Sequence, residues 1–415
     1  MKRVAGSKQN GKGANVDYKD ADEMNSRIFM IQTLIPLGLQ AVNAELQEEV
    51  LHLAGGRHVQ DGGSVKRWGF NPGSVCLEGQ KVKIDVPRLR DMSTMSEIPL
   101  KSYAALRNTE IINENALKQI LNGISQRKYA KVTRKVTETF GIKHSSVGKR
   151  FVKASIEQLK ELQGRDLSGE DIVSVFIDGK RFAENGVIIA LGITLAGIKK
   201  LLGIIESGTE NRMVIGDFMN DLVRRGLKVE NGILFVIDGS KGIYRGVQDV
   251  VGKSAFVQRC QWHKRENVVK YLDKKHQDTF RAKLQRAYEE PTYDRAKAKL
   301  LVVRKELALL NESAVTSLDE GMEETLTLHK LGMFEKLGRS FKTTNCLENV
   351  NSLLGGYTDR VCRWQNSNMR QRWVAAALLE IEPRLRKVDG YKHLKELREV
   401  MKGKMAKDVS QVKAA

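Results

Sequence analysis

The stretch from Ile172 to Arg259 constrains the fold of this chain more than any other part. Its apolar runs and short turns predict three successive strands of an antiparallel meander, at 172–177, 186–198 and 199–208. The helical spacing and apolar runs that follow predict a helix, a strand, a helix and a strand, at 211–226, 232–237, 242–251 and 255–259. This order of elements indicates an α/β domain.

The predicted order is that of the ribonuclease H-like fold, in which the first and fourth strands lie side by side. Asp178 follows the first apolar run and Asp238 follows the fourth, so we expect the two carboxylates at adjacent strand ends. Neighbouring carboxylates raise each other's pKa unless a cation lies between them, which is typical of a divalent-metal site. The alternative is that each Asp is a turn residue, because Asp-Gly is common in turns.

A third carboxylate, Glu348, lies in the segment from Phe341 to Tyr357. Thr343 or Thr344 is expected to cap a helix that carries Glu348 in its first turns and ends at the glycine pair 355–356. Asn345, Glu348 and Asn349 follow one another at spacings of three and four, so we expect one polar face directed at a site.

Four blocks of sequence resemble mutator-type insertion-sequence transposases, a family of DDE recombinases. The blocks are Asp178-Gly179, Asp238-Gly239-Ser240-Lys241-Gly242, Cys260-Gln261-Trp262-His263 and Thr343-Thr344-Asn345-Cys346-Leu347-Glu348-Asn349-Val350-Asn351. They occur in the family's order, and the resemblance covers roughly residues 172–397. It implies a DNA transposase that binds the terminal inverted repeats of an insertion sequence.

The resemblance implies that Asp178, Asp238 and Glu348 are catalytic and hold two Mg²⁺ ions roughly 4 Å apart, for which Mn²⁺ can substitute. The expected reaction is nicking at the element end and transfer of the freed 3′-hydroxyl to another phosphodiester. His263 is expected to contact the scissile phosphate or orient a carboxylate. The chain departs from the DDE pattern after Glu348, because the next basic residue is Arg360.

The Cys260-x-x-His263 block has other interpretations. It could be half of a zinc site that Cys346 or Cys362 completes, although a second closely spaced ligand pair is missing. His263 could also be a hydrogen-bonded structural histidine. We expect the Trp262 indole to be buried in the core, and the alternative is stacking on a distorted DNA base.

The charge of the chain favours a polyanionic partner. Seventy Lys and Arg stand against fifty Asp and Glu, which is a formal net charge of +20. In the stretch 123–153, nine Lys and Arg stand against one acidic residue, and a predicted helix ending at Phe140-Gly141 and another beginning at His144 or Ser145 indicate a helix-turn-helix. The alternative is a solvated basic face on a helical hairpin.

The expected DNA contacts come from this stretch and from basic residues near the carboxylates. They are Arg127, Lys128, Lys131, Arg134, Lys135, Lys143, Lys149, Arg150, Lys241, Arg360 and Arg363.

The sequence divides into six expected regions. They are a flexible basic terminus (1–26), a helix with a small β-containing module (27–100), a helical DNA-binding domain (101–165), a ribonuclease H-like catalytic core (171–263 and 339–383), a helical insertion (264–338) and a basic C-terminal helix or tail (384–415).

Four cysteines without a tight framework or a secretory signal indicate a reducing compartment, so we expect a cytoplasmic, nucleoid-associated protein. No apolar stretch reaches the ~20 residues that span a bilayer. The expected partner is double-stranded DNA, both element ends and target, bound by a homodimer or larger homo-oligomer. The alternative functions are a non-catalytic helix-turn-helix regulator and a ribonuclease H-like structure-specific nuclease.

Overall fold

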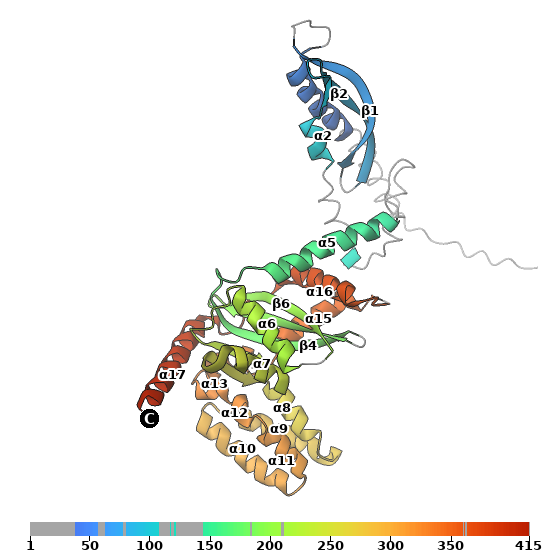
Figure 1. The fold of residues 1–415 in the computed structure, drawn as a ribbon. Helices are drawn as coiled ribbons and strands as arrows, with labels where there is room; N and C mark the ends of the chain where they lie inside the picture. Colours follow the sequence, from blue (N-terminus) through green and yellow to red (C-terminus); the bar gives the residue numbers. More distant parts are fainter. Residues whose placement is uncertain are drawn as a thin grey trace, which may run out of the picture. The chain divides into compact units, whose positions relative to one another are not determined.

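The computed structural model describes residues 38–56, 63–77, 80–107, 117, 120–121, 144–182, 185–208, 211–359, 361 and 363–414. The chain divides into two compact units, which we describe separately (Figure 1). The first comprises Met1–Gln119 and Ser125–Gly148, and the second comprises Ile120–Ile124 and Lys149–Ala415.

The first unit is built on a three-stranded antiparallel sheet in the order β1-β2-β3. Its elements are a helix over 38–54, β1 (Val65–Leu77), β2 (Gln80–Asp91), β3 (Ser96–Ile98) and α2 (Lys101–Leu106). Apolar residues of the first helix, such as Leu46, pack with strand residues such as Val75 and Leu89 in one core. The carboxylate of Glu49 accepts the backbone N–H groups of Lys101 and Ser102, which ties the first helix to the start of α2.

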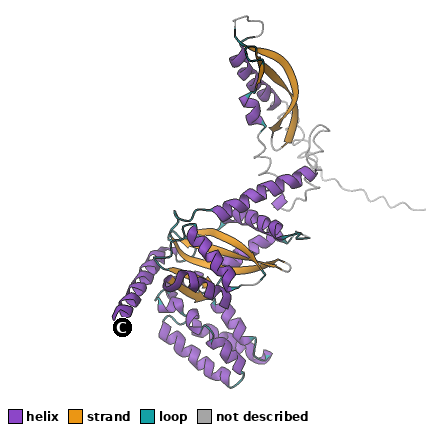
Figure 2. Ribbon diagram, viewed as in Figure 1, coloured by secondary structure: helices purple, strands orange, loops and turns teal. Residues whose placement is uncertain are grey.

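The second unit is built on a five-stranded sheet in the order β6-β5-β4-β7-β8. Figure 2 shows its strands in orange among purple helices. The strands are β4 (Ile172–Phe182), β5 (Asn185–Thr194), β6 (Lys199–Ser207), β7 (Ile233–Ile237) and β8 (Ala255–Arg259). The first three are antiparallel, whereas β7 and β8 run parallel to β4. The prediction that the first and fourth of these strands lie side by side is confirmed.

Helices α6 (Arg212–Arg224) and α7 (Lys241–Val251) bury one face of this sheet. Helix α15 (Asn345–Thr358) packs against β4, and the ring of Phe341 lies 5.6 Å from that of Phe176 on β4. The remaining elements around the sheet are α5 (His144–Gly164), η1 (Gly252–Ser254), α16 (Ser367–Ile381), η2 (Glu382–Arg384), η3 (Tyr391–His393) and α17 (Leu394–Ala414).

The stretch between β8 and α15 is helical, as the sequence predicts, and much of it has its own apolar core (Figure 1). Its helices are α8 (Gln261–Val269), α9 (Lys274–Tyr288), α10 (Tyr293–Ala308), α11 (Glu312–Asp319), α12 (Met322–Thr325), α13 (Thr327–Lys330) and α14 (Phe334–Phe341). Within the residues that the structure describes, none of the helices is long and apolar enough to cross a membrane.

Two predicted boundaries are wrong. Strand β4 continues beyond Ile177 to Phe182, because its ladder with β5 extends past the point where pairing with β7 ends. Helix α15 runs through the glycine pair and ends at Thr358. The two glycines therefore lie inside the helix and do not end it.

The contact between α6 and α7 leads to a stability prediction. A Cβ at Gly246 of α7 would lie 2.6 Å from Ile215 Cβ and 2.9 Å from the Arg212 carbonyl oxygen of α6. Alanine normally stabilises a helix relative to glycine by about 1 kcal/mol. Here we expect Gly246→Ala to destabilise the chain by about 1–3 kcal/mol in urea unfolding, because backbone has to move.

The matched control is Gly216→Ala on α6, where a Cβ meets no atom within 4 Å. It should be neutral or stabilising. Equal unfolding midpoints for the two variants would contradict the close α6–α7 packing.

The buried Lys264 of α8 leads to a prediction about pH. Burial lowers the pKa of its ammonium from 10.5 to about 8, although the group donates to the carbonyl oxygens of Ser317 and Glu320 at the end of α11. Between these two values the unfolded chain binds more protons, so the free energy of unfolding rises with pH by on the order of 2 kcal/mol.

We expect wild type to gain stability between pH 7.5 and 10 relative to Lys264→Met, which lacks this titration. Urea unfolding of both proteins across that range measures the difference. Parallel curves would show that the lysine keeps its ordinary pKa when folded.

Candidate active site

Asp178 and Asp238 lie next to each other where the parallel pairing of β4 with β7 ends. The last β4–β7 pair is Ile177 with Ile237, and each Asp is the next residue of its strand or loop. Neighbouring strands lie ~4.8 Å apart, so the two Asp backbones are adjacent. Asp178 is within β4 and not at its end, which corrects the expectation from the sequence. Both side chains are half-buried.

One oxygen of each carboxylate is fixed by a nearby backbone N–H. Gly179 N donates to Asp178 Oδ1 at 2.9 Å, and Ser240 N donates to Asp238 Oδ1 at 2.9 Å. Side chains alternate along a strand, so Asp178 is on the face of β4 that carries Phe176. That face is covered by α14 and α15, which brings the third carboxylate from the same side.

Helix α15 is joined to β4 through Asn351. Its Nδ2 donates to Asp178 Oδ2 at 3.4 Å, and its carbonyl oxygen accepts from Lys180 Nζ. Burial lowers the pKa of Lys180, whereas Asp359 opposes that shift. The Oδ1 atom of Asn351 is buried and has no hydrogen-bond partner within the described part of the chain. Asn351 thus presents a buried acceptor beside Asp178.

Thr344 connects Glu348 to His263. It occupies the N-cap position of α15, as predicted, but its hydroxyl donates to Glu348 Oε1 at 2.8 Å instead of capping the helix. The same hydroxyl oxygen lies 3.4 Å from His263 Nδ1 and 3.6 Å from Cys260 Sγ. Because a hydroxyl has one proton, the imidazole is the donor of its contact with Thr344 when it is protonated.

Cys260 and His263 form the turn from β8 into α8. Cys260 N donates to the Ile237 carbonyl oxygen at 2.7 Å, and its buried Sγ accepts from His263 N at 3.5 Å. Gln261 N donates to the carbonyl oxygen of Lys342 at 2.9 Å. The second of these interactions caps α8, and the last joins the Cys-x-x-His block to the segment that precedes Thr344.

The pKa of His263 is raised from 6.5 to about 9. Its interaction with the Cys260 sulfur has the largest effect, burial opposes it, and the carboxylates of Asp238 and Glu348 add to it. Burial raises the pKa of the Cys260 thiol, but the hydrogen bonds with His263 outweigh burial and lower it. An imidazolium near two of the three carboxylates places positive charge where an anionic substrate would meet them.

A cationic residue that sequence reasoning missed, Arg259, ends β8, where it pairs with Ile237, the residue before Asp238. Its side chain is 6% exposed, lies 3.7 Å from Glu320, and stacks 5.6 Å from the Tyr244 ring centre. Lys241 is 69% exposed and lies 3.4 Å from the same glutamate. The sequence could have indicated Arg259, because it ends the predicted strand 255–259, and this strand is expected next to the strand that precedes Asp238.

The other predicted site residues are distributed as follows. Asn345 and Asn349 line a cavity whose lining does not include Glu348, so the prediction that the three side chains share one site is wrong. Trp262 is 46% exposed with its indole edge-on to His263, so the expectation of a core indole is wrong. Lys149 on α5 and Arg363 are exposed. The side chains of Arg127, Lys128, Lys131, Arg134, Lys135, Lys143, Arg150 and Arg360 lie outside the described residues.

Among the described residues, no three His, Cys, Asp or Glu side chains are gathered closely enough to hold a metal ion. Cys346 donates instead to the Ser340 carbonyl oxygen, so it does not complete a zinc site with Cys260 and His263. Asp178 and Asp238 lie together, while Glu348 is held by Thr344. The site in this form is a pair of carboxylates with a third one nearby.

Comparison with known proteins gives one consistent result. The family described as "Transposase, Mutator family" matches residues 8–385. The transposase for insertion sequence element ISRM5 from Rhizobium meliloti (strain 1021) is 26% identical over 408 residues, 95% of this chain and 97% of the relative. The transposase for IS256 in transposon Tn4001 from Staphylococcus aureus is 26% identical over 330 residues, 76% and 81% of the two chains. The transposase for IS406 from Burkholderia multivorans is 24% identical over 328 residues, with the same coverage.

Proposed function

Because the chain belongs to the Mutator family of transposases, we propose that it is a DDE-type enzyme that nicks the ends of an insertion sequence and transfers the freed 3′-hydroxyl to another phosphodiester. Asp178, Asp238 and Glu348 are the proposed catalytic carboxylates. The observation that carries the proposal is the β4–β7 register, which makes Asp178 and Asp238 neighbours. The strand order β6-β5-β4-β7-β8 supports a ribonuclease H-like core.

The donor set fits Mg²⁺. Carboxylate oxygens are the ligands this ion prefers, and the unpaired Oδ1 of Asn351 is a further oxygen beside Asp178. When bound between these carboxylates, divalent ions would activate the attacking water or 3′-hydroxyl and stabilise the leaving oxygen. Because Glu348 is hydrogen-bonded to Thr344 in this form, we infer that its side chain reorients when the site is loaded.

The protein's own residues have distinct roles in this proposal. Backbone N–H groups of Gly179 and Ser240 orient the two aspartates. Thr344 positions Glu348, and His263, protonated at neutral pH, donates to Thr344 and presents charge to a phosphodiester. Lys241, an exposed residue near Glu320 at the start of the helix that follows Asp238, is proposed to contact phosphate.

Recognition of the element ends is assigned to the basic stretch 123–153, and the proposed substrate is double-stranded DNA. Two ends must be brought together, so the active form is proposed to be a homodimer or larger assembly. The alternative of a non-catalytic regulator is favoured by one observation, that the three carboxylates are not gathered as a metal site in this form. The experiment below separates the two.

We expect strand nicking and joining to fall by at least about 1000-fold in each of three variants, Asp178→Asn, Asp238→Asn and Glu348→Gln. Each substitution removes a negative charge that would hold the divalent ions, and these ions would stabilise the transition state. DNA affinity should stay unchanged. The assay is gel analysis of labelled duplexes carrying the terminal repeats, with Mg²⁺. The matched control is Asp217→Asn, an exposed carboxylate on α6. Joining by any of the three variants at the control rate would refute the assignment.

Thr344→Val keeps the shape of a buried side chain and removes the hydroxyl that holds Glu348. We expect a 10- to 100-fold loss of activity, roughly the effect of removing a partner that orients a metal ligand, with a higher Mg²⁺ concentration at half-maximal rate. Thr344→Ser should restore both. An unchanged Mg²⁺ dependence in the valine variant would show that Thr344 only supports the fold.

A further inference from the structure

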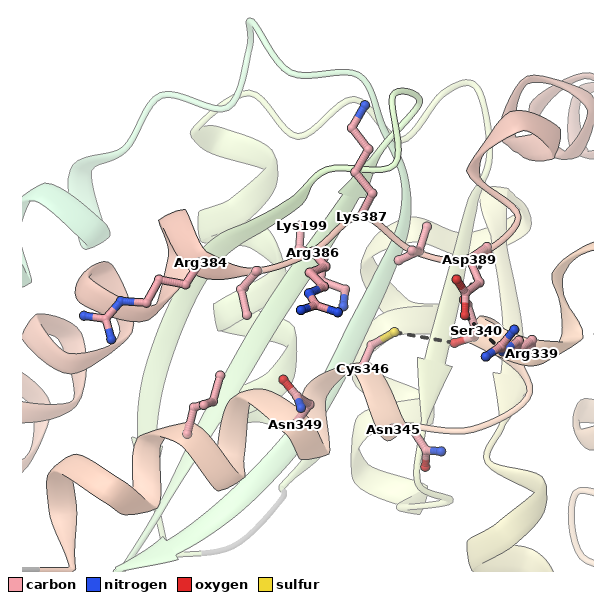
Figure 3. Close-up of a pocket in the computed structure, with 13 residues that line it drawn as sticks. Lys199, Arg339, Ser340, Asn345, Cys346, Asn349, Arg384, Arg386, Lys387 and Asp389 are labelled. Carbon is pink, nitrogen blue, oxygen red and sulfur yellow. Dashed lines mark hydrogen bonds and ion pairs between the residues drawn. The ribbon is translucent and has the colours of Figure 1, made fainter.

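A cationic cavity lies between α15 and the segment 384–389, and nothing in the proposed reaction uses it (Figure 3). Its volume is about 570 Å³. Five cationic side chains and a single carboxylate line it, namely Lys199, Arg339, Arg384, Arg386, Lys387 and Asp389. These cations come from β6, α14 and the chain after α16, so the charge is assembled by the fold and not by one basic run.

The positive charge of this cavity is largely uncompensated. Asp389 is paired with Arg339 at 3.0 Å, and Arg384 is paired with Glu380. In the parts of the chain that the structure describes, Lys199, Arg386 and Lys387 have no ion-pair partner. Like charges around one cavity repel each other, so an anionic ligand would be favoured there.

The wall that carries Arg384, Arg386 and Lys387 is held in place. Val388 N donates to the Gly197 carbonyl oxygen at 3.1 Å, and Val388 itself is buried. Ser340 Oγ donates to the Asp389 carbonyl oxygen at 3.0 Å. The cationic segment is therefore fixed both to the β5–β6 turn and to α14.

The opposite wall of the cavity is the helix that carries Glu348. Figure 3 shows Asn349 of α15 directed toward Arg386, and Cys346 beside them. Leu353 and Leu385 add apolar surface. A strand bound at Glu348 would therefore pass within about one helix diameter, ~10 Å, of this cavity.

We propose that this cavity binds backbone phosphates of a DNA strand that continues past the carboxylate site. The inference rests on the proposed function. The cavity has a volume of about 570 Å³ and is lined by cationic side chains from three elements of the fold. One phosphate would contact only some of these side chains, whereas several phosphates of one strand would contact all of them. The apolar side chains can contact deoxyribose. Lysines, arginines and asparagine amides bind phosphates through contacts that do not depend on the base sequence.

The test compares Lys199→Glu/Arg386→Glu with Lys275→Glu/Arg295→Glu in the full chain. Both double variants change the net charge equally, and the control residues are exposed on α9 and α10. Fluorescence anisotropy without Mg²⁺ measures affinity for an end duplex across a salt series. We expect the cavity variant to bind at least 10-fold more weakly than the control variant, with a log–log salt slope shallower by about 2, one for each lost phosphate contact. Equal affinities and slopes would overturn the proposal.

Cys346 gives a readout that needs no substitution. Because it lines the cavity, its rate of alkylation at pH 8.5, measured by peptide mass spectrometry, reports whether the cavity is occupied. Bound duplex should slow modification of Cys346. An unchanged rate at saturating DNA would contradict the proposal even if the charge variants fail to fold.

Two further arms separate the possible failures. Inorganic phosphate or pyrophosphate that protects Cys346 as well as DNA does, at equal phosphate concentration, would identify a small-anion site and overturn the polynucleotide assignment. Asp178→Asn is expected to keep wild-type binding and Cys346 protection. If catalysis proves independent of Asp178 while the cavity variant still loses affinity, the proposed chemistry fails and the DNA contact stands.

Discussion

The parallel pairing of β4 with β7 is the constraint on which the rest of the site depends. It ends at Ile177 and Ile237, so backbone pairing makes neighbours of two carboxylates that are sixty positions apart in the chain. Their orientation then follows from backbone N–H groups one and two residues away. A shift of one residue in this register would turn Asp178 or Asp238 to the other face of the sheet, where α6 and α7 form the core.

Helix α15 is placed by a small set of polar contacts. Asn351 and Lys180 hold its middle on β4, and Thr344 holds its start near Cys260 and His263. Glu348 lies between these two attachments, one turn from each, so its backbone is well fixed, and the Thr344 hydroxyl holds its side chain. One side of the helix carries Glu348, and another side lines the cationic cavity.

Local sequence was sufficient to predict the strands and their order, because apolar runs and turn residues act within a few positions of each other. That order in turn predicted the meeting of Asp178 and Asp238. Sequence reasoning failed where the decisive contact is remote. The glycine pair at 355–356 was expected to stop the helix, but α15 continues to Thr358 while packed on β4, a contact that is remote in the sequence. Tryptophan is usually a core residue, but Trp262 lies exposed beside His263. The position of Arg259 depends on the pairing of β8 with β7, which the local sequence does not show.

The central claim is that Glu348 joins the two aspartates around divalent ions once DNA is bound. Anomalous diffraction at the manganese edge, from crystals of the full chain with an end duplex and Mn²⁺, measures this directly. The account predicts anomalous peaks within coordination distance of Asp178, Asp238 and Glu348, with Glu348 released from Thr344. Manganese bound elsewhere, with Glu348 still on Thr344 and DNA in place, would contradict it.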